Sequence, residues 1–239
     1  MKLALLISGG GTTMQAIISA CKDGRLPAVE PVLVIASNEN AGGIKKALDL
    51  GISEKDILVI NPKDFPSQEE FGEKIIKECR KRGVNFIGQY GWMVKTPENV
   101  IKECAGRIVN QHPGPLDNGR PDFGGLGMYG LRVHEARLEF VHKTNRDFWT
   151  EATAHRVTTN FDEGTIVKRR PVPILWDDTA ETLQARVLPI EHEVQIETLR
   201  DFSEDTVEEF HRKIPLVLSG EENILEEAKI IAKKKYPNS

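Results

Sequence analysis

Short apolar runs alternate with helical stretches along the first 110 residues, and this alternation restricts the fold more than any other feature of the sequence. Five apolar runs are expected strands, at residues 3–7, 32–36, 57–60, 84–88 and 107–110. The helices expected between them lie at residues 14–22, 43–50 and 68–82, and a polar helical turn precedes the last strand. Strands that are apolar throughout are typical of a parallel sheet buried on both faces. We therefore predict an α/β protein whose mostly parallel sheet is covered by helices on both faces.

The pattern changes after residue 112. Residues 113–130 are rich in glycine and proline and show almost no periodicity, and a loop of this length is usually functional or mobile. Residues 152–158 and 165–173 are expected to form a hairpin around the turn at 160–164. The remaining chain predicts two amphipathic helices.

The first of these helices carries an apolar stripe that Pro189 is expected to interrupt. The stripe consists of Leu183, Val187, Ile190 and Val194. The second helix carries Ile224, Leu225, Ala228 and Ile231 on one face, and it belongs to a C-terminal extension.

Composition excludes several classes of protein. With 39% hydrophobic and 28% charged residues among 239, the chain is an ordinary globular protein rather than a disordered one. Its net charge of −4 argues against bulk attraction to nucleic acid. No apolar run is long enough to span a membrane, and the apolar start is too short for a signal peptide. The three cysteines lie far apart without metal-ligand spacing, so we expect a cytoplasmic protein without a metal.

A glycine turn, Gly9 to Gly11, follows the first expected strand. Glycines let a phosphate approach the backbone, and the N–H groups of the next helix favour negative charge. The turn matches neither the Walker A motif nor GxGxxG, because position 14 is methionine. Close packing of strand and helix would require small residues equally well, so both interpretations stay open.

Asn110 and His112 end a buried strand and point to the same side of it. Ligands bind at this end of the strands in open α/β sheets, where asparagine can donate a hydrogen bond and histidine can act as acid or base. For an isolated pair, buried residues with satisfied hydrogen bonds are the more common case.

Three further positions have structural alternatives. Asp162 in the expected turn would ordinarily bond its own backbone, unless the hairpin carries it to His112. Glu191 and His192 would by default lie on a solvated helix face. The Trp92-Met93 pair suits the core, although it would also suit a flat heterocycle.

Taken together, several segments resemble the folate-dependent formyltransferases, in particular the branch that formylates glycinamide ribonucleotide in purine synthesis. The segments that carry the resemblance are residues 6–18, 36–38, 91–93, 105–113, 157–164 and 185–192. The order of Asn-x-His followed by Asp-x-Gly is specific to the family. The resemblance overturns the structural alternatives above and implies a Rossmann-like formyltransferase fold.

The resemblance implies attack of an acceptor amine on the formyl carbon of 10-formyltetrahydrofolate. Asn110, His112 and Asp162 would be catalytic: the first two would stabilise the oxyanion, and Asp162 would keep the histidine charged and help move the proton through water.

The resemblance also implies three binding sets and two kinds of small-molecule partner, the formyl folate co-substrate and a phosphorylated amine acceptor. The acceptor phosphate would be held by Gly9, Gly10, Gly11, Thr12 and Thr13, and the rest of the acceptor would contact Glu191. The folate would be bordered by Trp92, Met93, Val94, Thr158 and Asp162. No metal, nucleic acid or membrane is implied, and a homodimer is left open.

The expected domain organisation follows from the resemblance. A catalytic domain would span residues 1–202, with a Rossmann-like phosphate-binding half at 1–100 and a folate and catalytic half at 101–202. A helical extension would occupy residues 203–239.

The departures from the family concern the acceptor side. Thr13 stands where asparagine is usual, Gly10 where a polar residue is often found, and Leu188 where a polar acceptor contact is common. Residues 114–117 replace Ser-Leu-Leu-Pro, and the stretch to His134 is about ten residues longer than usual.

Three functions are therefore compared: the glycinamide ribonucleotide transferase, a related enzyme acting on another amine or on water, and a non-catalytic folate or nucleotide binder. We expect the catalytic fold to begin at Met1 without the regulatory domain that formyltetrahydrofolate hydrolases generally carry, which disfavours the hydrolase. The intact catalytic set disfavours the non-catalytic binder.

Overall fold

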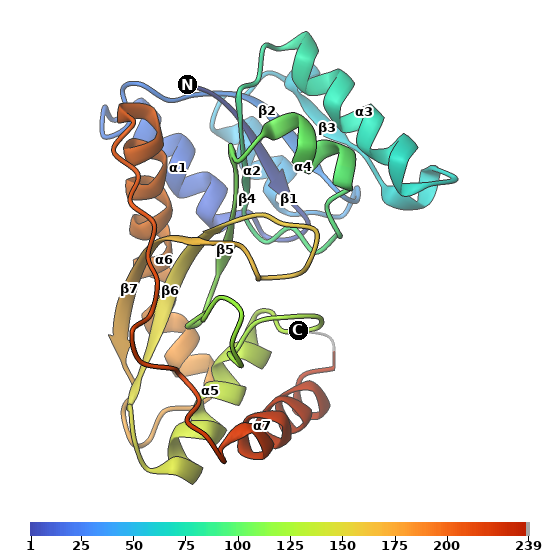
Figure 1. Ribbon diagram of the computed structural model, residues 1–239. Coiled ribbons are helices and arrows are strands. Elements are labelled where there is room, and N and C mark those ends of the chain that lie inside the picture. The colour runs from blue at the N-terminus through green and yellow to red at the C-terminus, as the bar shows by residue number, and fades with distance from the viewer. Residues whose placement is uncertain (238–239) are drawn as a thin grey trace. The chain divides into compact units, whose positions relative to one another are not determined.

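The computed structural model describes residues 1–237 and contains a seven-stranded sheet in the order β3-β2-β1-β4-β5-β6-β7 (Figure 1). The strands are β1 Lys2–Ile7, β2 Glu30–Ala36, β3 Ile57–Val59, β4 Phe86–Gln89, β5 Ile108–His112, β6 Trp149–Arg156 and β7 Ile166–Pro173. The pairings among β1 to β5 are parallel, and β6 and β7 form an antiparallel hairpin. The predicted α/β class with a mostly parallel sheet is confirmed.

Seven α-helices occur in the described part of the chain. They are α1 Thr12–Lys22, α2 Gly43–Asp49, α3 Gln68–Lys81, α4 Glu98–Cys104, α5 Leu131–Thr144, α6 Ala180–Glu204 and α7 Glu222–Lys235. Short 3-10 turns lie at Glu54–Asp56 and Pro62–Asp64. No helix among residues 1–237 is long and apolar enough to cross a membrane.

The chain divides into two compact units. The first holds residues 1–110 and 195–207, and the second holds residues 111–194 and the chain from residue 208 onward. The domain boundaries expected from the sequence at residues 100 and 202 stay predictions.

In the first unit, the central strand β1 is buried on both faces of the sheet. Residues Leu3 to Ile7 of β1 are fully buried one after another, which requires cover on both sides because successive side chains point to opposite faces. Phe71 on α3 stacks against Trp92, with ring centroids 6.4 Å apart and planes 5° from parallel. Gly88 on β4 leaves room for the ring of Tyr90.

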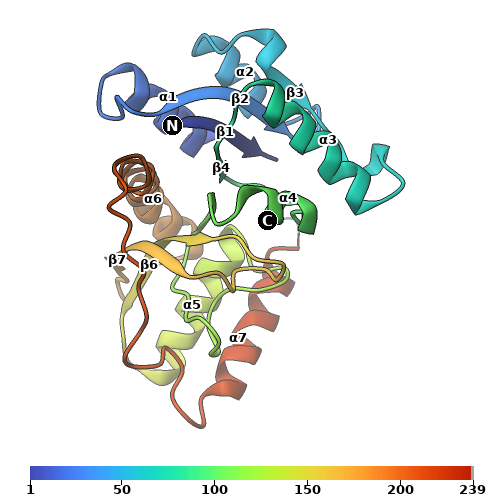
Figure 2. The same cartoon turned by 45° about the horizontal axis from the view of Figure 1, so that its top comes forward.

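In the second unit, α5 and α7 pack side by side and share one hydrophobic core (Figures 1 and 2). The core consists of Phe123, Met128, Val133, Ala136, Phe140, Leu216, Val217, Leu225, Ala228 and Ala232. Two of these residues come from the loop at 113–130, so the C-terminal helix and the long loop are parts of the same packed structure.

Helix α5 was not among the elements expected from the sequence. Its buried face includes His134 and Arg137 besides apolar residues, which conceals the helical periodicity. Two nitrogens of the Arg137 guanidinium are hydrogen-bonded locally, since Nε donates to Trp149 O at 2.8 Å and Nη2 to Asp147 O at 2.7 Å.

The expected interruption at Pro189 is wrong, because α6 runs continuously from Ala180 to Glu204. A proline removes one backbone donor, but the turns on either side keep their hydrogen bonds. The buried stripe that includes Leu183, Val187 and Val194 keeps the helix packed.

Gly11 should tolerate substitution much less well than its neighbour Gly10. It has φ of 65°, and a Cβ added there would lie 2.7 Å from Gly43 Cα, whereas one added at Gly10 would meet nothing within 4 Å. We expect Gly11→Ala to lower the free energy of unfolding by about 2 kcal/mol, because a left-handed conformation costs roughly 1–2 kcal/mol before any clash. Urea unfolding followed by circular dichroism measures this, and equal losses for Gly10→Ala and Gly11→Ala would contradict it.

Candidate active site

In the first unit, Ser8 joins the carboxyl ends of three strands. Its Oγ accepts hydrogen bonds from Ser37 Oγ at 2.7 Å and from Met93 N at 2.9 Å. Its carbonyl oxygen accepts one from Asn38 Nδ2 at 3.0 Å. The segments 36–38 and 91–93, which lie far apart in the sequence, therefore meet at the edge of the sheet where α/β proteins bind ligands.

The glycine turn leaves the N-terminus of α1 open. No side-chain hydrogen bond caps the helix, and its first turn contains no acidic residue. Gly9, Gly10 and Thr12 are exposed, whereas Thr13 is buried. Uncapped N–H groups beside exposed glycines favour an anion, since the helix dipole is positive at this end.

The three residues at 92–94 are placed differently. The ring of Trp92 is buried against Phe71, as the core interpretation predicts, and Met93 is 55% exposed. Val94 is half-buried. Met93 and Val94 are thus the members of this segment that reach the surface.

In the second unit, the turn between β6 and β7 carries Asp162 to His112. His112 Nδ1 lies 3.6 Å from Asp162 Oδ2, and His155 Nε2 lies 3.4 Å from Asp162 Oδ1. The turn closes tightly on glycine, because a Cβ at Gly164 would lie 1.6 Å from Arg156 O. Asp162 therefore has a role beyond the local backbone.

The two nitrogens of the His112 ring have different surroundings. With Nδ1 facing Asp162, the other nitrogen, Nε2, is buried and has no hydrogen-bond partner within residues 1–237. Gly114 leaves space beside it, since an added Cβ would lie 3.5 Å from Nε2 and 2.4 Å from Val133 Cγ1. A buried polar nitrogen without a partner is uncommon and points to a ligand atom that would accept its hydrogen bond.

Burial and charge act in opposite directions on the two groups. Burial raises the pKa of Asp162, but His112, His155 and the Gly125 N–H together lower it to about 2, so the carboxylate is ionised. Burial lowers the pKa of His112 more than Asp162 raises it. Burial and the carboxylate thus act in opposite directions on the imidazole, and the expectation that Asp162 keeps His112 charged stays a prediction.

His155 was not among the candidate site residues predicted from the sequence. It lies on β6, its Nδ1 contacts Arg156 O at 2.9 Å, and it is buried. The sequence feature that could have indicated this contact is the position of His155 on the strand that leads to the Asp162 turn.

The loop at 113–130 is packed rather than open. Phe123 is fully buried, and Asp122 accepts hydrogen bonds from Asp117 N at 2.7 Å and Gly124 N at 2.9 Å. Burial raises the pKa of Asp122 to about 6. Asn118 Nδ2 donates to Glu163 O at 3.1 Å, which ties the loop to the turn that carries Asp162.

Glu191 is buried, so the expectation of a solvated helix face is wrong for this residue. Its Oε1 accepts a hydrogen bond from Gln111 Nε2 at 2.6 Å. Burial raises the pKa of Glu191 to about 7 despite this bond. The neighbouring His192 is half-buried. A carboxyl group that exchanges its proton near neutral pH is typical of functional sites.

The other predicted residues divide between the units. Asn110 is half-buried on β5 and ends the first stretch of the first unit, whereas Thr158 is exposed in the second unit, just after β6. Within residues 1–237, no group of three or more histidine, cysteine or acidic side chains could hold a metal ion.

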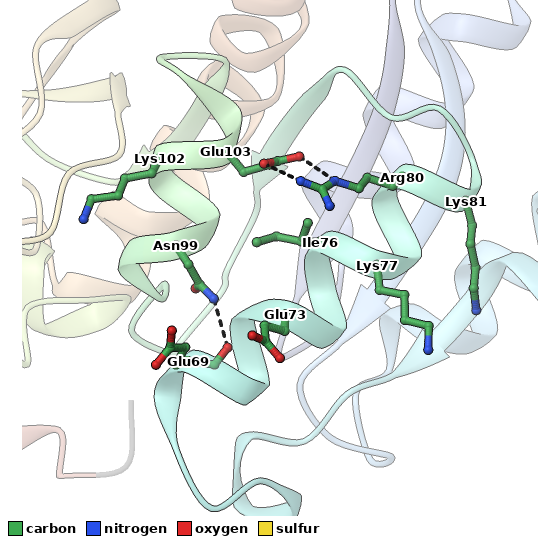
Figure 3. Close-up of a pocket in the computed structure, with 9 residues that line it drawn as sticks. All are labelled: Glu69, Glu73, Ile76, Lys77, Arg80, Lys81, Asn99, Lys102 and Glu103. Atoms are coloured by element: carbon green, nitrogen blue, oxygen red, sulfur yellow. Dashed lines mark hydrogen bonds and ion pairs between the residues drawn. The ribbon is translucent and has the colours of Figure 1, made fainter.

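A groove of about 830 Å³ lies elsewhere in the first unit, between α3 and α4 (Figure 3). Two of its charged side chains pair with each other: Arg80 Nε and Nη2 donate to the two carboxylate oxygens of Glu103, at 2.8 and 2.9 Å. Asn99 Nδ2 donates to Glu69 O at 2.9 Å. The groove contains no residue that the sequence analysis selected, so we do not assign it to the chemistry.

Comparison with known proteins identifies the family of the chain. A family model described as "Formyl transferase" matches residues 1–199, and the chain belongs to the formyl transferase family. The resemblance found from the sequence is confirmed.

The names of the similar proteins specify which members of the formyl transferase family this chain resembles. The chain is 31% identical over 217 residues to the chloroplastic phosphoribosylglycinamide formyltransferase of Arabidopsis thaliana, covering 90% of this chain and 70% of that protein. It is 30% identical to the phosphoribosylglycinamide formyltransferase of Haemophilus influenzae, covering 85% of this chain and 87% of that protein. The solved structure of glycinamide ribonucleotide transformylase 1 from Symbiobacterium toebii superposes with a TM-score of 0.74 at 31% identity, covering 86% of this chain and 88% of that one.

Substitution of Glu191 should change the pH dependence of stability. Because the pKa of Glu191 is raised from 4.5 to about 7, its contribution to stability is fully present below pH 4.5 and is lost as the pH rises through 7. Glu191→Gln removes this loss, so we expect its free energy of unfolding at pH 8 to exceed that of the wild type by up to about 3 kcal/mol.

Chemical unfolding at pH 4.5 and pH 8 measures the effect, with Glu204→Gln on the exposed part of the same helix as the control. An identical pH dependence for wild type and Glu191→Gln would contradict the assignment.

Proposed function

We propose that the protein transfers the formyl group of 10-formyltetrahydrofolate to the amine of glycinamide ribonucleotide, a step of purine synthesis. The observation that carries this proposal is His112, buried at the end of β5 with Nδ1 facing Asp162 and Nε2 without a partner in the described chain. Membership of the formyl transferase family and the names of the relatives support the same reaction.

The acceptor amine attacks the formyl carbon, and the carbonyl oxygen becomes an oxyanion in a tetrahedral intermediate. The intermediate then collapses: the bond from the formyl carbon to N10 of the folate breaks, N10 takes up a proton, and the amine loses one. The Asn110 amide and His112 Nε2 would donate hydrogen bonds to the oxyanion. Because negative charge develops within reach of the ring, the pKa of His112 rises during the step and favours the imidazolium.

Asp162 has two roles in this proposal. Its carboxylate, whose pKa is about 2, stays ionised throughout the physiological range and holds Nδ1 of His112. It would also accept the amine proton through a water molecule, as a general base at this position can. The low pKa favours the first role, since a strongly stabilised carboxylate is a weak base.

The binding roles are proposed residue by residue. The acceptor phosphate would bind the uncapped N-terminus of α1 through residues 9–13, and Glu191 would contact the rest of the acceptor. The folate would be bordered by residues 92–94, Thr158 and Asp162. The formyl folate is thus the proposed co-substrate, and no metal takes part in the proposed reaction.

We also propose the cytoplasm as the compartment. All three cysteines (Cys21, Cys79 and Cys104) are free, and burial raises the pKa of each, so they are unreactive thiols suited to a reducing environment. A homodimer stays a prediction.

The direct test is formyl transfer from 10-formyltetrahydrofolate to glycinamide ribonucleotide, with reactions lacking the acceptor as a control. We expect acceptor-dependent release of tetrahydrofolate, and we expect His112→Ala to lower kcat about 10²–10³-fold, as the loss of one oxyanion donor does. His211→Ala, which removes an exposed histidine, should leave kcat unchanged.

Release of tetrahydrofolate at the same rate without acceptor would replace the proposal with a formyltetrahydrofolate hydrolase. A folded protein that binds the folate but does not formylate glycinamide ribonucleotide would point to another amine. The longer loop at 113–130 is the feature of this chain that would select such an acceptor.

A further inference from the structure

Helix α7 lies beyond residue 199, where the match to the formyl transferase family ends. Its lysines differ in environment. Lys229 has a side chain only 15% exposed, whereas Lys233, Lys234 and Lys235 at the end of the helix are exposed. Burying an ammonium group is costly unless it is paired or hydrogen-bonded, so the partner of Lys229 deserves a structural explanation.

Lys229 Nζ donates a hydrogen bond to the carbonyl oxygen of Gly124 at 3.2 Å. That carbonyl belongs to the same peptide group as the Gly125 N–H, which donates to Asp162 Oδ2 at 3.0 Å. Lys229 is therefore connected through one peptide to the carboxylate that faces His112. The second charged contact of Lys229, with Glu226 at 4.0 Å, involves a largely exposed side chain.

The connecting peptide is held in one orientation. Gly124 N donates to Asp122 Oδ1 at 2.9 Å, and a Cβ at Gly124 would lie 2.7 Å from both Asp162 Cβ and Leu116 Cδ2. Gly125 has φ of 97°, a conformation that favours glycine. The two glycines thus allow the backbone to approach Asp162 closely enough to donate to it.

A positive charge on one end of a peptide strengthens the donor at its other end. Hydrogen bonds in a chain polarise one another, and those to charged groups are stronger than neutral ones. The ammonium of Lys229 therefore makes the Gly125 N–H a better donor to Asp162 than an ordinary amide.

We propose that Lys229 is a positioning residue for the formyl transfer, which holds the Gly124–Gly125 peptide so that Gly125 fixes Asp162 against His112. This inference rests on the proposed function, which gives Asp162 and His112 their roles. It assigns α7, outside the matched family region, a part in the site.

The electrostatic interactions around His112 and Asp162 support the role proposed for Lys229. The charged and titratable groups that interact with His112 come from the turn (Asp162), β6 (His155), α5 (His134) and α7 (Lys229). Asp122 of the loop interacts with Asp162 and Lys229, and Glu226 contacts Lys229. Among these, Lys229 lowers the pKa of His112. Loss of its charge should therefore raise that pKa, and loosening of the Gly125 N–H should raise the pKa of Asp162 as well.

The test compares Lys229→Met, which removes the charge, with Lys229→Arg, which keeps it, and with Lys234→Met as the matched control on the same helix. For each variant, kcat and KM for both substrates are measured, and NMR titration gives the pKa of the His112 ring in the ligand-free protein. We expect Lys229→Met to lower kcat about tenfold with KM little changed, and to raise the pKa of His112. Lys229→Arg and Lys234→Met should resemble the wild type in both measurements.

The proposal would be overturned if Lys229→Met and Lys234→Met had the same kcat and the same pKa of His112. It would also be overturned if Lys229→Met and Lys229→Arg both lost kcat while the pKa of His112 stayed unchanged. If Lys229→Met does not fold, Lys229→Gln takes its place against Lys229→Arg under the same criteria. The NMR titration needs no acceptor. An inactive wild type would therefore refute the proposed function, and the titration would still show whether Lys229 affects the pKa of His112.

Discussion

The Asp162 carboxylate receives contacts from three segments that are far apart in the sequence: the end of β5, the strand β6 and the loop at 113–130. His112 and His155 lie on either side of it, and the Gly125 N–H donates to it. Each contact favours the charged form, and together they overcome the cost of burial. The tight turn of the β6–β7 hairpin, the glycines of the loop and the packing of α7 all have to be in place for this carboxylate to be held.

Burial also shifts the pKa of several other groups in the second unit. Asp122 and Glu191 have pKa values raised to about 6 and about 7, and the pKa of His134 is lowered to about 3, in each case chiefly by burial. Asp122 and Glu191 therefore exchange their protons close to neutral pH, whereas His134 is neutral there.

Much of the site followed from the sequence because its residues end regular elements. Asn110 and His112 could be placed by the apolar strand before them, and Asp162 by the turn pattern that ends at Gly164. The interactions with Gly125 and Lys229 could not be predicted, since they join residues 37 and 105 positions apart through an irregular loop. Three other features were missed for a related reason: helix α5, the burial of Glu191 and the contact of His155 with Asp162. A polar residue that is buried by tertiary packing has the same sequence pattern as one on the surface.

The shared core of α5 and α7 also constrains the order in which the chain can fold during synthesis. The ribosome presents residues 111–194 before α7, yet Phe123, Val133 and Phe140 pack against side chains of that later helix. Until α7 has left the exit tunnel, these apolar surfaces lack their partner and the loop at 113–130 lacks its anchor. The nascent second unit therefore stays incomplete, with part of its core uncovered, until α7 has emerged from the ribosome.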